Sequence, residues 1–217
     1  MKNLINLLLS LIYKENCCVC GSSYDNLPVC KSCLKTVENL SGFAQRKIEG
    51  VEIYSAAVYR GVLKDIIHKF KFNHKKQLVN VLADILNNYY KNCEKLKSYQ
   101  NVVVVPVPTS KNNIKERGYN NVYEIARKFA SLQRFEFNPN ILLKTKNTIP
   151  QFKLRKNQRD KNVYGAFRVN IKEYTLGATI LIIDDIITTG ATLEEIIKTF
   201  KKEGIENMVC LTCAKAV

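Results

Sequence analysis

The chain has 217 residues, enough for one sizeable hydrophobic core and a small additional module. Its apolar fraction of 46% and charged fraction of 24% are those of a folded water-soluble protein. The formal net charge of +15 favours a polyanionic partner such as nucleic acid, an acidic membrane surface or a phosphorylated substrate. An abundance of Lys, Asn and Ile, typical of AT-rich genomes, explains the charge equally well, so charge alone does not identify a partner.

The first thirteen residues are strongly apolar. Their large aliphatic side chains are Leu4, Ile5, Leu7, Leu8, Leu9, Leu11 and Ile12. No small-residue cleavage site follows them, and the run is too short to span a bilayer. We therefore predict a short helix packed on the protein's own core, with a membrane anchor as the alternative. No integral membrane segment is expected, and the predicted location is the cytoplasm, with the inner face of the membrane as a further possibility.

Two CxxC pairs follow, Cys17/Cys20 and Cys30/Cys33, separated by nine residues. Pairs at this distance can place four thiolates around one ion, so we predict a closed structural Zn2+ site. A redox pair or disulfides are the alternatives, but a cytosolic chain disfavours disulfides and a redox motif would not be doubled. Cys18 fits the spacing less well and is expected to be a bystander. Residues 1–45 would form this N-terminal helix and zinc module, and residues 46–217 the main domain.

The main domain alternates predicted strands and helices. Residues 51–59 and 102–105 resemble buried strands, whereas residues 62–72, 78–89 and 122–129 show helical spacing. Residues 109–121, after a Pro-Val-Pro segment, are predicted to be a polar loop. This order predicts an α/β fold with a parallel sheet flanked by helices and ligands at the carboxyl edge of the strands. In the last strand, residues 208–214, Cys210 and Cys213 should face opposite sides and act as packing residues.

Residues 144–161 carry seven cationic side chains and one anionic side chain. We predict a basic loop here. Lys153, Arg155, Lys156 and Arg159 are candidates to bind single-stranded nucleic acid, with Tyr119, Phe152 and Tyr164 as stacking surfaces. The alternatives are a loop that closes over a bound phosphate ligand and a purely solvated disordered loop.

Residues 180–192 carry the most specific pattern. An apolar strand is predicted to end in two carboxylates, Asp184 and Asp185, and a hydroxyl-rich turn then leads to Thr192, spaced from Glu195 as in a capping box. A strand, a loop and a helix N-terminus together form a phosphate site, and two adjacent carboxylates suit the hydroxyls of a sugar phosphate. The alternative is an ordinary strand-to-helix turn with two solvated acids.

This segment resembles the motif by which type I phosphoribosyltransferases bind phosphoribosyl pyrophosphate (PRPP). The resemblance implies that Asp184 and Asp185, also the candidate catalytic residues, hold the ribose. It further implies that Thr188, Thr189, Gly190, Ala191 and Thr192 wrap the 5-phosphate. It assigns Thr109, Ser110 and Lys111 to the diphosphate loop, and it implies Mg2+ as the partner ion of PRPP.

Shorter motifs resemble the ComF family of competence proteins, within the same superfamily. They are the paired CxxC motifs, Phe70-Lys71-Phe72, Val105-Pro106-Val107-Pro108, Arg117-Gly118-Tyr119-Asn120, Arg159-x2-Asn162 and Gly165-Ala166-Phe167. The resemblance implies a cytoplasmic protein that helps bring incoming single-stranded DNA across the inner membrane in natural transformation, beside a helicase-like DNA-uptake ATPase.

Three functions are therefore compatible with the sequence. The leading hypothesis is a ComF-like competence protein that retains a Mg–PRPP site. The alternative is an active phosphoribosyltransferase acting on an unidentified base or amine. The third is a zinc-ribbon interaction protein whose main domain is inert.

Overall fold

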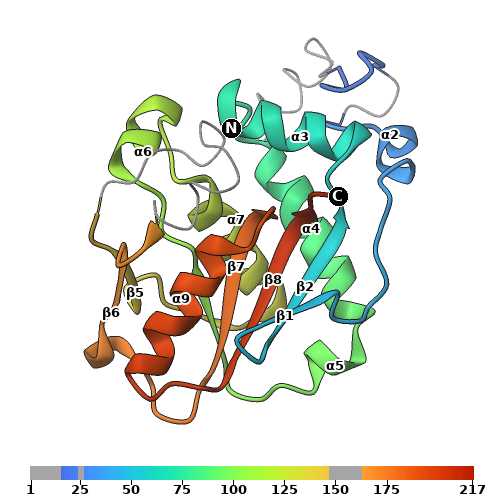
Figure 1. Ribbon diagram of the computed structural model, residues 1–217. Helices are drawn as coiled ribbons and strands as arrows, with labels where there is room; N and C mark the ends of the chain where they lie inside the picture. The colour runs from blue at the N-terminus through green and yellow to red at the C-terminus, as the bar shows by residue number, and fades with distance from the viewer. Residues whose placement is uncertain (1–15, 24–26, 147–162) are drawn as a thin grey trace, which may run out of the picture.

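The computed structural model describes residues 16–23, 27–146 and 163–217. A six-stranded sheet with strand order β1-β2-β8-β7-β3-β4 forms the centre of the molecule (Figure 1). Its strands are β1 (Arg46–Ile48), β2 (Val51–Val58), β3 (Val102–Pro106), β4 (Glu136–Phe137), β7 (Thr179–Ile187) and β8 (Met208–Lys215). The helices are α2 (Lys31–Lys35), α3 (Gly61–Phe72), α4 (Leu78–Lys91), α5 (Glu94–Lys97), α6 (Lys111–Arg117), α7 (Asn121–Gln133) and α9 (Ala191–Lys202).

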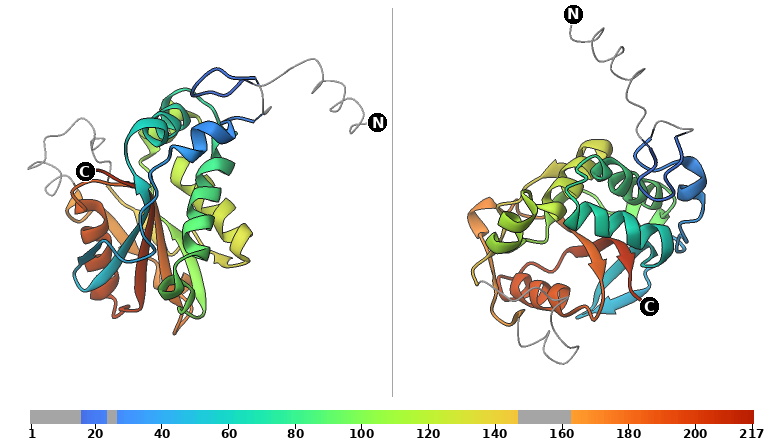
Figure 2. Two further views of the ribbon diagram at one scale, coloured as in Figure 1. Left: turned by 90° about the vertical axis from the view of Figure 1, so that its right-hand side faces the viewer. Right: turned by 90° about the horizontal axis from the view of Figure 1, so that it is seen from above.

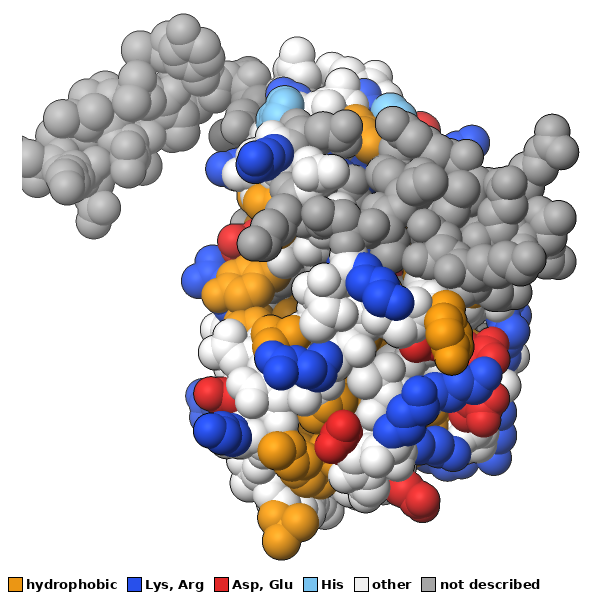
Figure 3. Space-filling model, turned by 60° about the vertical axis from the view of Figure 1, so that its left-hand side comes forward, with side chains coloured by type: hydrophobic (Ala, Val, Ile, Leu, Met, Phe, Trp, Pro, Cys, Tyr) orange, Lys and Arg blue, Asp and Glu red, His pale blue; other side chains and the backbone are white. Residues whose placement is uncertain are grey.

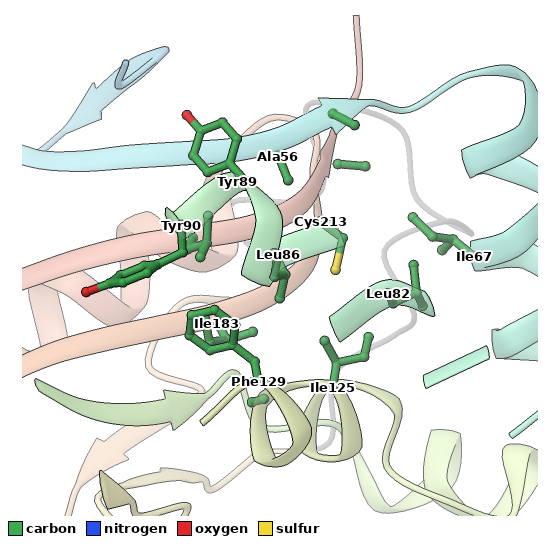
Figure 4. Packing of buried hydrophobic residues seen from close by; sticks show 14 of the residues in the cluster. Ala56, Ile67, Leu82, Leu86, Tyr89, Tyr90, Ile125, Phe129, Ile183 and Cys213 are labelled. Carbon is green, nitrogen blue, oxygen red and sulfur yellow. The ribbon is translucent and has the colours of Figure 1, made fainter. Parts of the chain in front are cut away.

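Helices cover both faces of the sheet. Figure 2 shows the sheet on edge, with α9 on one side and α3, α4 and α7 on the other. The strands are apolar on both faces because both are buried. In β7, Leu181 and Ile183 pack on the α4 side, whereas Ile180 and Ile182 pack on the α9 side. On the α4 side the aromatic rings of Tyr90 and Phe129 meet the aliphatic side chains of α4 and α7 (Figure 4). The α/β prediction with flanking helices is confirmed.

The sheet departs from the predicted all-parallel arrangement in two ways. Strand β1 pairs antiparallel with β2 at one edge, where Arg46 lies opposite Ile53. A separate antiparallel pair, β5 (Leu142–Lys144) with β6 (Phe167–Val169), lies beside α9, and a short 3-10 helix, η3 (Ile171–Glu173), follows it. Three-residue strands give too little alternation to be recognised from sequence. The other pairings in the large sheet are parallel, so β2, β3, β7 and β8 end at one edge.

The prediction of a polar loop over residues 109–121 was wrong. Helix α6 occupies Lys111–Arg117 and ends at Gly118, which has a φ of 75°. Asn120 then begins α7, since its side-chain oxygen accepts a hydrogen bond from the backbone N–H of Tyr123 at 3.2 Å. The polar composition reflects a short helix at the surface, because a helix without a buried stripe shows no apolar period.

Strand β8 confirms the prediction for its two cysteines. Cys210 and Cys213 are both fully buried, and they belong to the two separate hydrophobic clusters on opposite faces of the sheet. Side chains three positions apart on a strand point in opposite directions, so one metal ion cannot bind both.

The cysteine module, residues 16–23 and 27–45, shares a core with the main domain. Val29, Cys30 and Val37 belong to the same buried cluster as Phe70 of α3 and Leu82 of α4. The domain boundary at residue 45 stays a prediction. Within the described ranges, no helix is both long and apolar enough to cross a bilayer.

Candidate functional site

Two adjacent carboxylates lie near the carboxyl end of β7. The strand was predicted to end at Asp184 and Asp185, but it continues to Ile187 because Ile186 and Ile187 still pair with β8. Asp185 is buried and Asp184 is half-buried. The Oδ1 atom of Asp184 accepts a hydrogen bond from the backbone N–H of Asp185 at 2.8 Å. The acid pair therefore belongs to the rigid sheet and not to a loop.

Lys71 of α3 supplies the counter-charge. Its Nζ lies 2.7 Å from Oδ2 of Asp185, with the two side chains 16% and 9% exposed. In the sequence Lys71 stands out only as part of Phe70-Lys71-Phe72, and that motif gives it no role. Lys71 is far from Asp185 along the chain, and the two residues come together only because α3 packs against the carboxyl edge of the sheet. In the structure, Lys71 neutralises one of the two acids directly.

The second acid is in a different electrostatic environment. Burial and the neighbouring Asp185 charge raise the pKa of Asp184 from 3.8 to about 7, while Lys71 and Lys144 oppose the rise. Lys144 ends β5 and lies over the ring of Phe167, 5.5 Å from its centre. Burial lowers the pKa of Lys144, and the charge of Asp184 opposes that shift. Lys144 was predicted to lie in the basic loop, but it is the last residue of strand β5. Its positive charge acts on Asp184.

The raised pKa of Asp184 predicts a pH-dependent stability. Between about pH 4 and pH 7 folded Asp184 holds a proton that the unfolded chain releases, so the free energy of unfolding falls as the pH rises through this window. Asp184→Asn should remove that fall and make the variant more stable than the wild type at pH 8, with the difference shrinking toward pH 4. Urea denaturation at several pH values measures this. Asp65→Asn, an exposed change on α3, is the control, and parallel pH profiles of Asp184→Asn and wild type would contradict the prediction.

The turn after β7 brings backbone and hydroxyl groups beside the acids. Asp184, Thr188, Gly190 and Thr192 line a small hollow of about 30 Å³. The carbonyl of Thr189 accepts a hydrogen bond from Nη1 of Arg46 on β1 at 2.6 Å, which ties the turn to the edge of the sheet.

Gly190 is required at its position. Its φ is 92°, and a Cβ atom there would lie 2.8 Å from Cδ1 of Ile48 and 3.0 Å from Nη1 of Arg46. Only glycine fits both the backbone conformation and the close approach.

The start of α9 differs from the predicted capping box. Gly190 is the N-cap, Ala191 begins the helix, and Thr192 lies inside the first turn. The side chain of Glu195 does not reach back along the helix. Its Oε1 accepts a hydrogen bond from the backbone N–H of Gly165 at 2.7 Å, which joins α9 to the segment before β6. The N–H groups of the first turn and the helix dipole still make the start of α9 suited to an anion.

The loop after β3 places two of the three predicted diphosphate residues before α6. The hydroxyl of Thr109 donates to Oδ1 of Asn120 at 3.0 Å, so this loop is joined to the start of α7. Ser110 is buried, and its carbonyl accepts the N–H of Ile114 at 3.1 Å. Lys111 begins α6. The assignment of Thr109, Ser110 and Lys111 to a diphosphate stays a prediction.

Most of the predicted nucleic-acid residues lie outside the described part of the chain, namely Lys153, Arg155, Lys156, Arg159 and Phe152. Tyr119 was wrongly predicted to offer a stacking surface. It is buried, its ring packs 5.3 Å from that of Phe70, and its hydroxyl donates to the Phe70 carbonyl. Tyr164 is 72% exposed. On the face drawn in Figure 3, Lys and Arg side chains of the described residues lie among Asp and Glu side chains.

The four cysteines of the paired motifs come together. Their Sγ atoms all lie within 4.8 Å of one another, with 3.9 Å between Cys17 and Cys33 and 3.7 Å between Cys20 and Cys30. Tetrahedral zinc with Zn–S bonds of about 2.3 Å requires sulfurs about 3.8 Å apart. The backbone N–H of Cys30 also points at Cys17 Sγ, at 3.3 Å. The cluster could therefore hold a metal ion such as zinc, and it does not include Cys18.

Residues 71–216 match the model of the phosphoribosyl transferase domain. The chain belongs to that family. It is 23% identical to "Competence protein F" of Haemophilus influenzae over 92% of this chain and 90% of that protein. It is 28% identical to "Competence protein ComFC" of Streptococcus pneumoniae, covering 92% and 89% of the two chains, and 24% identical to "DNA utilization protein YhgH" of Escherichia coli, covering 88% and 80%. The family match runs from Lys71 through the acid pair and α9 to the end of β8, and the relatives' names agree with the resemblance to competence proteins.

Proposed function

We propose that this protein binds PRPP with Mg2+ at the acid pair and the following turn, and that it acts in the uptake and handling of single-stranded DNA. The observation that carries the proposal is the position of Asp184 and Asp185 at the carboxyl edge of a parallel sheet, directly before the N-terminus of α9, in a chain of the phosphoribosyl transferase family. The names of its relatives support the DNA part of the proposal.

The proposed ribose contacts come from the two acids. Their carboxylate oxygens accept hydrogen bonds from vicinal hydroxyls, and Lys71 keeps Asp185 from repelling Asp184 at full strength. Because Asp184 holds a proton more readily than an ordinary acid, binding a ligand that donates hydroxyl hydrogens should favour its ionised form. Asp184 and Asp185 would thus position the sugar.

The 5-phosphate would lie against the turn of residues 188–192. N–H groups of the first turn of α9 and the threonine hydroxyls are donors suited to phosphate oxygens, and the helix dipole adds to the attraction. Thr109, Ser110 and Lys111 would face the diphosphate from the loop after β3. Mg2+, when bound with PRPP, would neutralise the diphosphate, and the carboxylate and hydroxyl oxygens available here are ligands that it accepts.

The DNA contacts would come from the basic segment that follows β5. Lys153, Arg155, Lys156 and Arg159 are the proposed residues, and the exposed ring of Tyr164 is a proposed stacking surface. At the acid pair Lys71 is already paired with Asp185, and the two adjacent carboxylates would repel a phosphate backbone. A phosphate backbone would therefore bind elsewhere than at the acid pair. We place this activity in the cytoplasm, beside a helicase-like DNA-uptake ATPase.

Neutralising three of the basic residues provides the test for DNA. Lys153→Gln/Arg155→Gln/Lys156→Gln should weaken binding to a fluorescent single-stranded oligonucleotide by about tenfold or more. The slope of log affinity against log salt should fall by about 2, since each phosphate contact contributes roughly 0.7. Fluorescence anisotropy at several salt concentrations measures both.

The control carries the same charge change elsewhere. Lys91→Gln/Lys172→Gln/Lys202→Gln alters three exposed lysines at separate places on the surface and should leave the slope nearly unchanged. Equal losses in the two triple variants would show that only overall charge matters and would contradict the proposed track.

Catalytic turnover is the second candidate function, favoured by the family match across the acid pair. Phosphoribosyl transfer passes through a cationic ribose, and a carboxylate such as Asp184 or Asp185 would stabilise that charge. Release of pyrophosphate from Mg–PRPP in the presence of base or amine acceptors tests it. If the protein binds PRPP but releases no pyrophosphate, the site binds PRPP without transferring its phosphoribosyl group.

A further inference from the structure

An apolar groove lies between the cysteine module and α4, and neither acid of the pair lines it. Its volume is about 500 Å³. Leu34 and Leu40 line one side, and Val81, Ile85 and Tyr89 of α4 line the other. Four of these side chains are half-buried, so they offer apolar surface to a ligand without being part of the closed core. A groove of this size and polarity is typical of a binding site for apolar side chains.

The groove carries an unusual charge for this protein. Although the chain has a net charge of +15, Asp84 is the one charged side chain among the residues that line the groove, and Asn80, Asn88 and Asn92 form much of the rim. The last turn of α4 adds the partial negative charge of a helix C-terminus. The groove therefore favours an occupant that is apolar along one side and weakly cationic, and it disfavours DNA.

We propose that the N-terminal segment of the same chain, residues 2–13, binds in this groove as an amphipathic helix antiparallel to α4. Asn16, the first described residue, lines a hollow together with Gln77, just before α4, and with Pro28, which also lines the groove. The segment therefore enters at the N-terminal end of α4. The path along α4 from Asn80 to Asn92 is about 18 Å, and twelve helical residues have the same length.

The sequence of the segment fits the same placement. On a helix Leu4, Ile5, Leu8, Leu11 and Ile12 form one stripe about 120° wide, and Ser10 lies on the opposite side. In the antiparallel orientation Lys2 comes near the C-terminal end of α4, where cations are favoured. The groove beside α4 therefore matches residues 2–13 in length, in polarity and in charge.

Tryptophan provides the test, since the chain contains none. Full-length Leu8→Trp should show blue-shifted emission and low acrylamide quenching, whereas Ser10→Trp, on the opposite face, should stay red-shifted and readily quenched. Adding Ile85→Asp to Leu8→Trp should restore the red emission. Asp84→Lys, an exposed change that should leave the fold intact, should at least partly release the segment.

Three results would overturn the proposal. The first is red emission from Leu8→Trp until anionic vesicles are added, because the segment is then a membrane anchor. The second is blue emission that depends on protein concentration, because the occupant is then a second copy. The third is blue emission that neither Ile85→Asp nor Asp84→Lys changes, because the segment then packs elsewhere.

Discussion

Replacing Cys30 with serine is expected to abolish metal binding by the four-cysteine cluster and to unfold the cysteine module. Structural zinc contributes an apparent free energy of about 10–16 kcal/mol in small cysteine-ligated modules. Among residues 16–23 and 27–45, Val29 and Val37 are the buried apolar side chains besides the cysteines, so the metal should supply much of the module's stability. Metal content and limited proteolysis measure the loss. Because Val29 and Cys30 share a core with Phe70, the melting temperature of the whole protein should also fall.

Cys18 provides a matched control within the same loop. It is adjacent to Cys17 but does not belong to the four-sulfur cluster. Cys18→Ser should therefore keep one metal ion per chain and nearly the stability of the wild type. The assignment of the four cysteines as tetrahedral ligands would be wrong if Cys30→Ser still bound metal. It would also be wrong if Cys18→Ser lost as much metal and stability as Cys30→Ser.

Replacing Lys71 with methionine should destabilise the protein by about 3–5 kcal/mol at neutral pH. The variant leaves the buried carboxylate of Asp185 without its partner at 2.7 Å, and removing one member of a buried ion pair costs about this much. The unpaired charge also lies beside Asp184, so the two acids would repel each other more strongly. Urea denaturation gives the free energy of unfolding.

Two further variants distinguish the loss of this ion pair from a general effect of lysine replacement on the stability of α3. Lys64→Met changes an exposed lysine of the same helix and should cost less than about 0.5 kcal/mol. Lys71→Met/Asp185→Asn removes both charges and should regain most of the loss, because the buried carboxylate is then absent. A double variant no more stable than Lys71→Met would show that the methionine itself disrupts packing.

The sheet and the acid pair were predictable because they depend on short-range patterns. Four consecutive valines and the Ile-rich run before Asp184 predict buried parallel strands, and alternation places Cys210 and Cys213 on opposite faces. The spacing of the paired CxxC motifs likewise predicted the cluster that the structure shows. In each case the residues that matter are near neighbours in the chain or repeat with a fixed period.

The rest of the site depends on tertiary contacts. Lys71 meets Asp185, Lys144 acts on Asp184, and Arg46 holds Thr189 only because α3, β5 and β1 converge on the end of β7. No local pattern encodes these pairs. Helix α6 was missed because it has no apolar stripe, and the start of α9 was placed late because Gly190, not Thr192, is the N-cap.

Titration calorimetry of Mg–PRPP into the zinc-loaded full-length protein is the most direct test of the proposed site. The proposal predicts saturable binding at one site per chain, lost in Asp184→Asn/Asp185→Asn while the fold of that variant persists by circular dichroism. Ribose 5-phosphate should bind more weakly than PRPP, because it lacks the diphosphate that the loop after β3 would hold. Absence of PRPP binding by the wild type, or binding that survives in the double variant, would contradict the assignment of the acid pair.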